Sequence, residues 1–72
     1  MDNVVTINTE FIKLQQFLKL CGAVETGGIA KLVIEDEHVK VNGETCDQRG
    51  KKLFPGDTVE FDSVIYRVEA LK

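Results

Sequence analysis

A short run of cations surrounds a glycine in the second half of the chain. Arg49, Lys51 and Lys52 flank Gly50, and a glycine among polar residues is typical of an exposed loop. The planar guanidinium of arginine can bind a phosphate through two parallel hydrogen bonds, whereas lysine supplies a compact charge. These residue types indicate phosphate binding, and the alternative is a solvated loop that only keeps the protein soluble.

A second candidate for phosphate binding is the segment Thr26-Gly27-Gly28, which precedes an apolar run over residues 29–34. Backbone N–H groups at a helix N-terminus point outward at the positive end of the helix dipole, and glycine lets a phosphate approach them. Lys31, one turn farther along, would add a point charge. Gly-Gly alone is a weak signal, because it also serves simply as a tight turn between packed helices.

Other kinds of chemistry find little support. His38 is the only histidine, and the two cysteines, Cys21 and Cys46, do not form a Cys-x-x-Cys motif, so a zinc site would need carboxylates to complete its ligands. Two sparse cysteines favour reduced thiols over a disulfide. No serine, cysteine and histidine arrangement suggests an activated nucleophile. The sequence therefore predicts no catalytic activity, no metal and no cofactor.

The charge distribution favours a local anion-binding patch over a generally basic surface. The 72-residue chain has a formal net charge of −3, yet residues 38–52 contain four cations against two acids. Because salt screens charges over about 8 Å, a partner responds mainly to the nearest patch. The composition, 43% hydrophobic and 29% charged, is that of a globular protein, and neither a membrane span nor a secretory signal is evident. We expect one cytoplasmic domain over residues 1–72.

Hydrophobic spacing predicts two helices after a first strand. Residues 3–7 are rich in β-branched side chains and predict that strand. Over residues 10–21 apolar side chains recur at three- and four-residue intervals, which predicts a helix capped by Asn8-Thr9 and ended by Gly22. Its polar face would present Lys13 and Gln16 as further phosphate-binding candidates. Residues 29–36, after the Thr-Gly-Gly start, predict a second and mostly buried helix.

The second half of the chain predicts a small sheet. Strands are expected at residues 39–41, 58–61 and 64–69, with Asn42-Gly43 and Pro55-Gly56-Asp57 as turns. Residues 48–53 are expected to form the basic loop. The order of elements predicts an α+β fold in which two helices pack on one side of a small, mostly antiparallel sheet. The four phenylalanines, Phe11, Phe17, Phe54 and Phe61, are expected in the core, and stacking of Phe54 on an exposed base is the less favoured alternative.

Four segments together resemble the S4 RNA-binding domain. They are Lys-Leu-Gln-Gln-Phe-Leu at 13–18, Thr-Gly-Gly-Ile-Ala-Lys-Leu-Val-Ile at 26–34, His-Val-Lys-Val-Asn-Gly-Glu at 38–44 and Pro-Gly-Asp-Thr-Val at 55–59. The resemblance covers about residues 10–61 and is greatest to the compact stand-alone bacterial members of the family. It implies the S4-like fold (αL motif) and binding to structured RNA, with ribosomal RNA, a ribosome or a ribosomal precursor as the expected partner.

The resemblance favours RNA contact over a merely solvated loop. The expected RNA-binding residues are Lys13, Gln16, Thr26, Gly27, Gly28, Lys31, Arg49, Lys51 and Lys52. These residues are expected to bind phosphates and to make few contacts with bases, because the deep and narrow major groove of A-form RNA does not admit side chains. Four positions depart from the family pattern. Lys13 stands where the family often has arginine. Gln15 stands where an acid is common, Gly27 where an arginine commonly follows the serine or threonine, and Glu37 where glycine usually precedes the next strand.

Two alternatives belong to other functional classes. A ubiquitin-like sulfur carrier of the β-grasp type has a similar Val-Asn-Gly-Glu and Leu-x-x-Gly-Asp-x-Val pattern. Such carriers end in Gly-Gly and begin with a hairpin, whereas this chain ends Ala70-Leu71-Lys72 and places a predicted helix early. The other alternative is a protein–protein adaptor that uses the acidic surface, and this role is compatible with RNA binding.

Overall fold

The computed structural model describes residues 3–71, which contain two helices and seven strands joined by turns and loops. Met1, Asp2 and Lys72, which the predicted domain includes, lie outside the described residues. The strands are β1 (Asn3–Ile7), β2 (Ile12–Lys13), β3 (Val39–Val41), β4 (Glu44–Thr45), β5 (Lys52–Leu53), β6 (Thr58–Phe61) and β7 (Val64–Ala70). The helices are α1 (Leu14–Leu20) and α2 (Gly27–Glu35).

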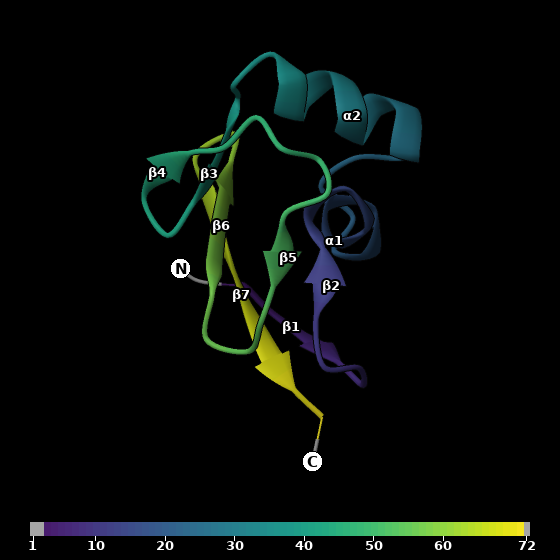
Figure 1. Ribbon diagram of the computed structural model, residues 1–72, viewed down its shortest axis with the longest axis vertical. Helices are drawn as coiled ribbons and strands as arrows, with labels where there is room; N and C mark the ends of the chain where they lie inside the picture. The colour runs from purple at the N-terminus through teal and green to yellow at the C-terminus, as the bar shows by residue number, and fades with distance from the viewer. Residues whose placement is uncertain (1–2, 72) are drawn as a thin grey trace.

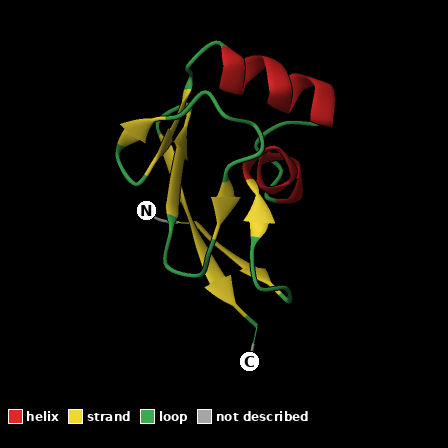
Figure 2. Ribbon diagram, viewed as in Figure 1, coloured by secondary structure: helices red, strands yellow, loops and turns green. Residues whose placement is uncertain are grey.

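Five of the strands form one sheet in the order β1-β7-β6-β3-β4, in which β1 runs parallel to β7 and the other neighbours are antiparallel. Strands β2 and β5 form a separate antiparallel ribbon, called the β2–β5 ribbon below. Both helices lie on the same side of the five-stranded sheet (Figures 1 and 2). The predicted α+β architecture, with two helices on one side of a mostly antiparallel sheet, is therefore confirmed.

The hydrophobic core lies between the two helices and the inner face of the sheet. Its fully buried side chains include Leu14, Phe17 and Leu18 of α1, Ile34 of α2, and Val39, Leu53, Val59 and Val68 of the strands. The ring of Phe17 meets that of Tyr66 edge-on, with centroids 6.3 Å apart. Each large apolar side chain buried in this way contributes roughly 1.5–3 kcal/mol. The core thus fixes both helices relative to the β2–β5 ribbon, which contributes Leu53 to it.

The first helix begins at Leu14, not at residue 10 as its apolar spacing predicts. Ile12 and Lys13 are instead extended and pair with β5. The N–H of Leu14 donates to the carbonyl of Lys51 (2.8 Å), and the N–H of Gln15 donates to the carbonyl of Arg49 (3.1 Å). The basic segment thus accepts hydrogen bonds from the first amides of the helix.

Two further predictions fail for the same reason. The expected cap at Asn8-Thr9 is wrong, because Lys13 occupies the N-cap position without a side-chain hydrogen bond. The expected loop over residues 48–53 is wrong at its end, because Lys52 and Leu53 form strand β5. Both errors come from pairing between segments far apart in the sequence, which local periodicity does not reveal.

Helix α2 begins as the Thr-Gly-Gly motif predicts, although at Gly27 and not at residue 29. The Thr26 hydroxyl accepts a hydrogen bond from the N–H of Ile29 (3.2 Å), as an N-cap residue does. The prediction of a mostly buried helix is wrong. Only Ala30 and Ile34 are buried, and Leu32 is 60% exposed. The outer face of α2, including Lys31, is open to solvent.

Both helices end in the same hydrogen-bonded motif, but with different residues at its left-handed position. After α1, Gly22 has φ of 79°, and its N–H donates to the carbonyl of Lys19. After α2, Glu37 has φ of 62°, and its N–H donates to the carbonyl of Ile34. This geometry is the Schellman end of a helix, which favours glycine. Glu37, which stands where the family usually has glycine, therefore occupies a strained backbone position.

We expect Glu37→Gly to raise the free energy of unfolding by about 1 kcal/mol, because glycine tolerates a positive φ that costs other residues roughly this much. For a chain of this size the melting temperature should rise by about 4–8 °C. The matched control is Glu35→Gly, which removes the same charge inside α2 and should lower stability by a similar amount. Thermal unfolding that shows Glu37→Gly to be no more stable than the parent would contradict the strain argument.

The two predicted turns of the second half are confirmed, and side chains link them. Asn42 and Gly43 both have positive φ, 53° and 85°, as the predicted hairpin requires. The Asn42 side chain accepts a hydrogen bond from the N–H of Thr58 (2.9 Å) and donates to Asp57 Oδ1 (3.2 Å). Asp57 Oδ2 in turn accepts from the N–H of Phe54 (2.8 Å). The two family motifs are thus one connected structure that fixes the end of β5.

The four phenylalanines differ in burial. Phe17 is buried, and Phe61 is partly buried and packs against the core, as predicted. Phe11 is only partly buried, and Phe54 is 43% exposed. The prediction that Phe54 belongs to the core is therefore wrong, because the turn that holds its backbone directs this side chain to the surface.

Candidate nucleic-acid interface

The β2–β5 ribbon brings two of the predicted phosphate-binding lysines together. Lys13 lies directly opposite Lys52 in the antiparallel register, and both side chains are exposed. Directly opposed side chains in such a pair have Cβ atoms about 4.5–5.5 Å apart, and like charges there are destabilising. A bound phosphate would relieve this repulsion. The geometry therefore creates a small site with a preference for anions.

Aromatic rings border this pair of lysines. The Lys52 ammonium lies 4.8 Å from the centroid of the Phe11 ring, within the range of a cation–π contact. The Phe11 and Phe54 rings lie 5.9 Å apart at an interplanar angle of 47°. One face of the ribbon thus carries two cations beside two partly or largely exposed aromatic rings.

Gln15 joins the ribbon to the start of α2. Its backbone N–H bonds to Arg49 in the basic segment, and its side-chain Nε2 donates to the carbonyl of Gly27 (2.9 Å). A Cβ atom on Gly27 would lie 3.4 Å from this Nε2, so Gly27 lets the two elements meet closely. Gln15 is absent from the predicted site residues. The signal that could have found it is its departure from the family pattern.

The start of α2 offers backbone donors to a ligand. The hydroxyl and the carbonyl of Thr26 accept from Ile29 and Ala30, respectively. Within residues 3–71 no acceptor contacts the N–H of Gly27 or Gly28, as is usual for the first amides of a helix. Gly28 is exposed, and a Cβ atom there would meet only the Thr26 hydroxyl, at 3.8 Å.

The remaining predicted residues are distributed around this centre. Lys51 directly precedes β5, and its side chain lies away from Lys52. It lines a shallow depression that also contains Glu44 and Asp47. Consecutive residues of an extended segment point in opposite directions, which explains why Lys51 and Lys52 diverge. Lys31 is exposed on α2. The structure therefore pairs Lys13 with Lys52 and, through hydrogen bonds of Gln15, links the backbone of Arg49 and the start of α2 to the ribbon.

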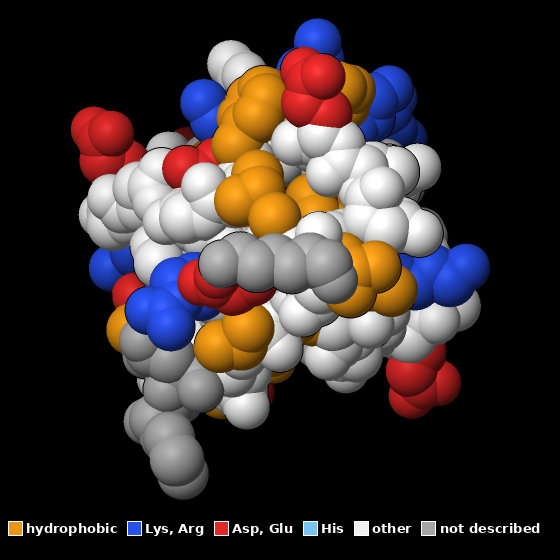
Figure 3. Space-filling model, turned by 90° about the horizontal axis from the view of Figure 1, so that it is seen from below, with side chains coloured by type: hydrophobic (Ala, Val, Ile, Leu, Met, Phe, Trp, Pro, Cys, Tyr) orange, Lys and Arg blue, Asp and Glu red, His pale blue; other side chains and the backbone are white. Residues whose placement is uncertain are grey.

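Gln16 borders a different surface. It lines an open groove with Phe11, Leu20 and Leu71, between α1 and the ends of β1 and β7. Figure 3 looks at the molecule from below and shows apolar side chains gathered near the centre of this face, with charged side chains towards its edges. Gln16 is thus less directly placed for phosphate contact than Lys13.

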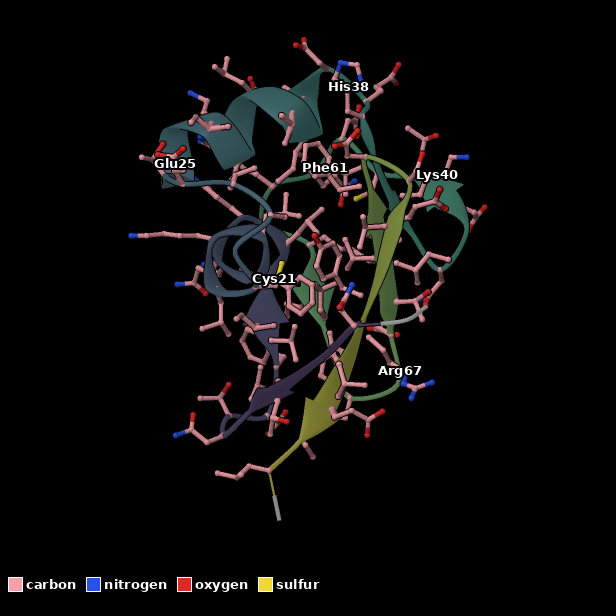
Figure 4. All side chains as sticks on the ribbon, turned by 180° about the vertical axis from the view of Figure 1, so that it is seen from behind. Cys21, Glu25, His38, Lys40, Phe61 and Arg67 are labelled. Atoms are coloured by element: carbon pink, nitrogen blue, oxygen red, sulfur yellow. The ribbon has the colours of Figure 1, made fainter. Side chains whose placement is uncertain are left out.

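Within residues 3–71, no cation of the site forms an ion pair within 4.0 Å, although Lys51 shares its depression with Glu44 and Asp47. Among the described residues, the ion pair within 4.0 Å joins Arg67 to Glu69 on β7. Lys40 and Arg67 lie on the side of the sheet away from the helices, whereas Glu25 lies at the start of α2 (Figure 4). Glu25 is therefore an acid near the start of α2, where a phosphate would approach the helix amides.

Removing this acid should strengthen anion binding. We expect Glu25→Gln to tighten binding to a ribosomal RNA hairpin about two- to fivefold, because a charge near a helix N-terminus contributes roughly 0.3–1 kcal/mol. Fluorescence anisotropy of a labelled hairpin measures the change. Asp62→Asn, in the turn between β6 and β7, is the matched neutralisation and should have a smaller effect. An equal gain in affinity from both variants would show that RNA binding responds to the net charge of the protein and not to the position of Glu25.

Other chemistry is not evident in residues 3–71. These residues contain no group of three or more histidine, cysteine and acidic side chains arranged to hold a metal. Cys21 and Cys46 are free thiols, and burial raises the pKa of the Cys21 thiol, which keeps it protonated at neutral pH and weakly nucleophilic. The described helices are too short and too polar to cross a bilayer.

The fold and the opposed lysines together describe a small α+β module with a cationic ribbon. The S4 domain family model matches residues 5–69, so the chain belongs to the S4 domain family. This result confirms the predicted family and places the chain among RNA-binding modules. The chain is 45% identical over 62 residues to a Bacillus subtilis (strain 168) protein described as the probable ribosome maturation protein RlbA. The match covers 86% of this chain and 87% of that protein.

A solved structure shows the same fold. The chain resembles the 30S ribosomal protein S4e from Thermoplasma acidophilum with a TM-score of 0.63 and 20% identity, over 83% of this chain. The match covers 32% of the Thermoplasma protein, so this chain spans about a third of its length. At this identity the likeness establishes the S4-type fold alone.

Proposed function

We propose that this chain is a non-catalytic, cytoplasmic module that docks on structured RNA, foremost ribosomal RNA or a ribosomal precursor. Phosphates are held by a basic surface, defined here as Lys13, Lys31, Arg49, Lys51, Lys52 and the backbone amides of Gly27 and Gly28. The observation that carries the proposal is the direct opposition of Lys13 and Lys52 on the β2–β5 ribbon, with no acid paired to either among the described residues. The description of the Bacillus relative supports the ribosomal context.

The arrangement suits the recognition of RNA shape. The donors come from a ribbon, a loop and a helix start that the core and Gln15 hold in fixed relation. Fixed donors match the regular spacing of phosphates along a backbone, whereas the identities of paired bases are hidden in the narrow major groove. Specificity for one RNA would then depend on the local path of its backbone.

Crosslinking in cells tests the proposal. The chain is crosslinked to RNA by ultraviolet light, purified under denaturing conditions, and the attached RNA is sequenced. The expected result is enrichment of ribosomal RNA at a few defined sites. The control is a variant with both Lys13 and Lys52 changed to glutamate, produced at the same level. Equal recovery of RNA with the parent and this variant would exclude the lysine pair from the contact. Recovery from the parent at the level of a charge-matched control protein would contradict the proposal and favour the protein–protein adaptor.

A further inference from the structure

Two aromatic rings share the outer face of the β2–β5 ribbon with the opposed lysines. Residues two apart along a strand point to the same side, so Phe11 belongs with Lys13 and Phe54 with Lys52. The contacts agree with this pattern, because the Lys52 ammonium lies 4.8 Å from the Phe11 ring and the two rings are 5.9 Å apart. The basic surface thus has two aromatic rings beside it that phosphate binding alone does not use.

Phe54 combines an exposed ring with a fixed backbone. Its side chain is 43% exposed, yet its N–H donates to Asp57 Oδ2 (2.8 Å) and its carbonyl accepts from the N–H of Asp57 (3.0 Å). Asp57 is held in turn by Asn42. Phe11 supports one side of the Phe54 ring. Such a ring loses little conformational freedom when a flat ligand stacks on it.

We propose that Phe54 is a stacking platform for an unpaired base, while Lys13 and Lys52 bind the phosphates of the same nucleotide and its neighbour. This inference rests on the proposed function and adds to it a preference for one kind of RNA site. Bases inside a continuous duplex are already stacked on each other, so only a nucleotide in a bulge, a loop or a helix end is free to stack on a side chain. The module therefore binds where an RNA helix is interrupted.

Two RNA probes separate stacking from phosphate binding. One is a perfectly paired stem, and the other is the same stem with an unpaired bulge. The test variant is Phe54→Leu, which keeps an apolar contact with Phe11 but removes the aromatic face. The parent should bind the bulged stem about 10-fold more tightly than the paired stem, and Phe54→Leu should lose most of this difference while binding the paired stem as before. Phe54→Tyr, which keeps the ring, should retain the preference.

The outcomes distinguish this inference from the proposed function. Equal affinity of the parent and Phe54→Leu for the bulged stem, with salt-dependent binding to both stems intact, would overturn the stacking and leave phosphate docking standing. A parent that binds neither stem would overturn both. A direct readout comes from Phe54→Trp, because the chain contains no other tryptophan. Stacking predicts that the bulged stem quenches its fluorescence more than the paired stem does, and binding without such quenching would contradict it.

Discussion

Changing Lys13 and Lys52 together to glutamate should weaken binding to a ribosomal RNA fragment by about 100-fold, or roughly 2.7 kcal/mol. The two side chains are opposed across the β2–β5 ribbon, so one phosphate can lie close to both. Each substitution removes an attraction and adds a repulsion at the same point. Anisotropy or filter binding at constant ionic strength measures the loss.

The control uses two cations elsewhere on the molecule, the exposed Lys40 and the partly buried Arg67. Lys40 and Arg67 lie on the sheet face away from the helices (Figure 4), and their joint change to glutamate alters the net charge by the same amount. This control should reduce the affinity much less, because salt screens charges beyond about 8–10 Å. Because Arg67 is ion-paired with Glu69, its replacement also breaks this ion pair. A single Lys40→Glu variant avoids this and completes the comparison. Similar losses at the two faces would contradict a defined basic surface.

The second large effect concerns stability. Asn42→Ala should lower the free energy of unfolding by about 2–3 kcal/mol, since it removes hydrogen bonds to Thr58 and Asp57 and puts alanine at a positive φ. A loss of this size corresponds to a fall in melting temperature of roughly 10–20 °C for a chain this small. Urea unfolding followed by circular dichroism measures the change.

Two comparison variants divide the effect of Asn42 into its parts. Asn42→Gly removes the same hydrogen bonds but tolerates the positive φ, so it should be less destabilising than Asn42→Ala by about 1 kcal/mol. Asn42→Asp keeps an acceptor for the Thr58 N–H but places a carboxylate against Asp57. Equal stability of the alanine and glycine variants would show that the backbone conformation contributes nothing.

The structure gives a reason for two departures from the family pattern that the sequence presents as unrelated. Gln15 and Gly27 are 12 positions apart, yet the Gln15 side chain donates to the Gly27 carbonyl. An acid at position 15 and an arginine at position 27 would therefore face each other as an ion pair. In this chain glutamine stands in place of the acid and glycine in place of the arginine, and a neutral hydrogen bond connects the two helices instead. The basic surface loses one arginine but no longer has the acid that would partly neutralise it.

Local sequence signals predicted those parts of the fold that depend on local chemistry. The Asn42-Gly43 turn requires only its own backbone conformation and appears where expected, and a helix follows Thr26, although it starts two residues earlier than predicted. Hydrophobic alternation likewise located β3 and β6. The predicted start of α1 is too early because Phe11 continues the apolar spacing of the helix, whereas Ile12 and Lys13 pair with a distant strand.

The candidate site was predictable in its residue types but not in its geometry. The basic segment and the glycine-rich helix start indicated phosphate binding, and the family resemblance implied that both belong to one S4-like fold. The opposition of Lys13 and Lys52 depends on long-range register, as does the bridge made by Gln15. The exposure of Phe54 depends on the Asp57 turn, and an apolar residue in isolation predicts burial.

The dependence of RNA binding on salt tests the central claim most directly. The association constant for one ribosomal RNA fragment is measured over a range of salt concentrations for the parent and for a variant with Lys13 and Lys52 both changed to glutamine. Phosphates held by about three to five cations predict that log K falls with log salt with a slope of about −3 to −4, and that the variant loses about two units of this slope. A slope near zero for the parent, or the same slope for both proteins, would contradict docking through this lysine pair.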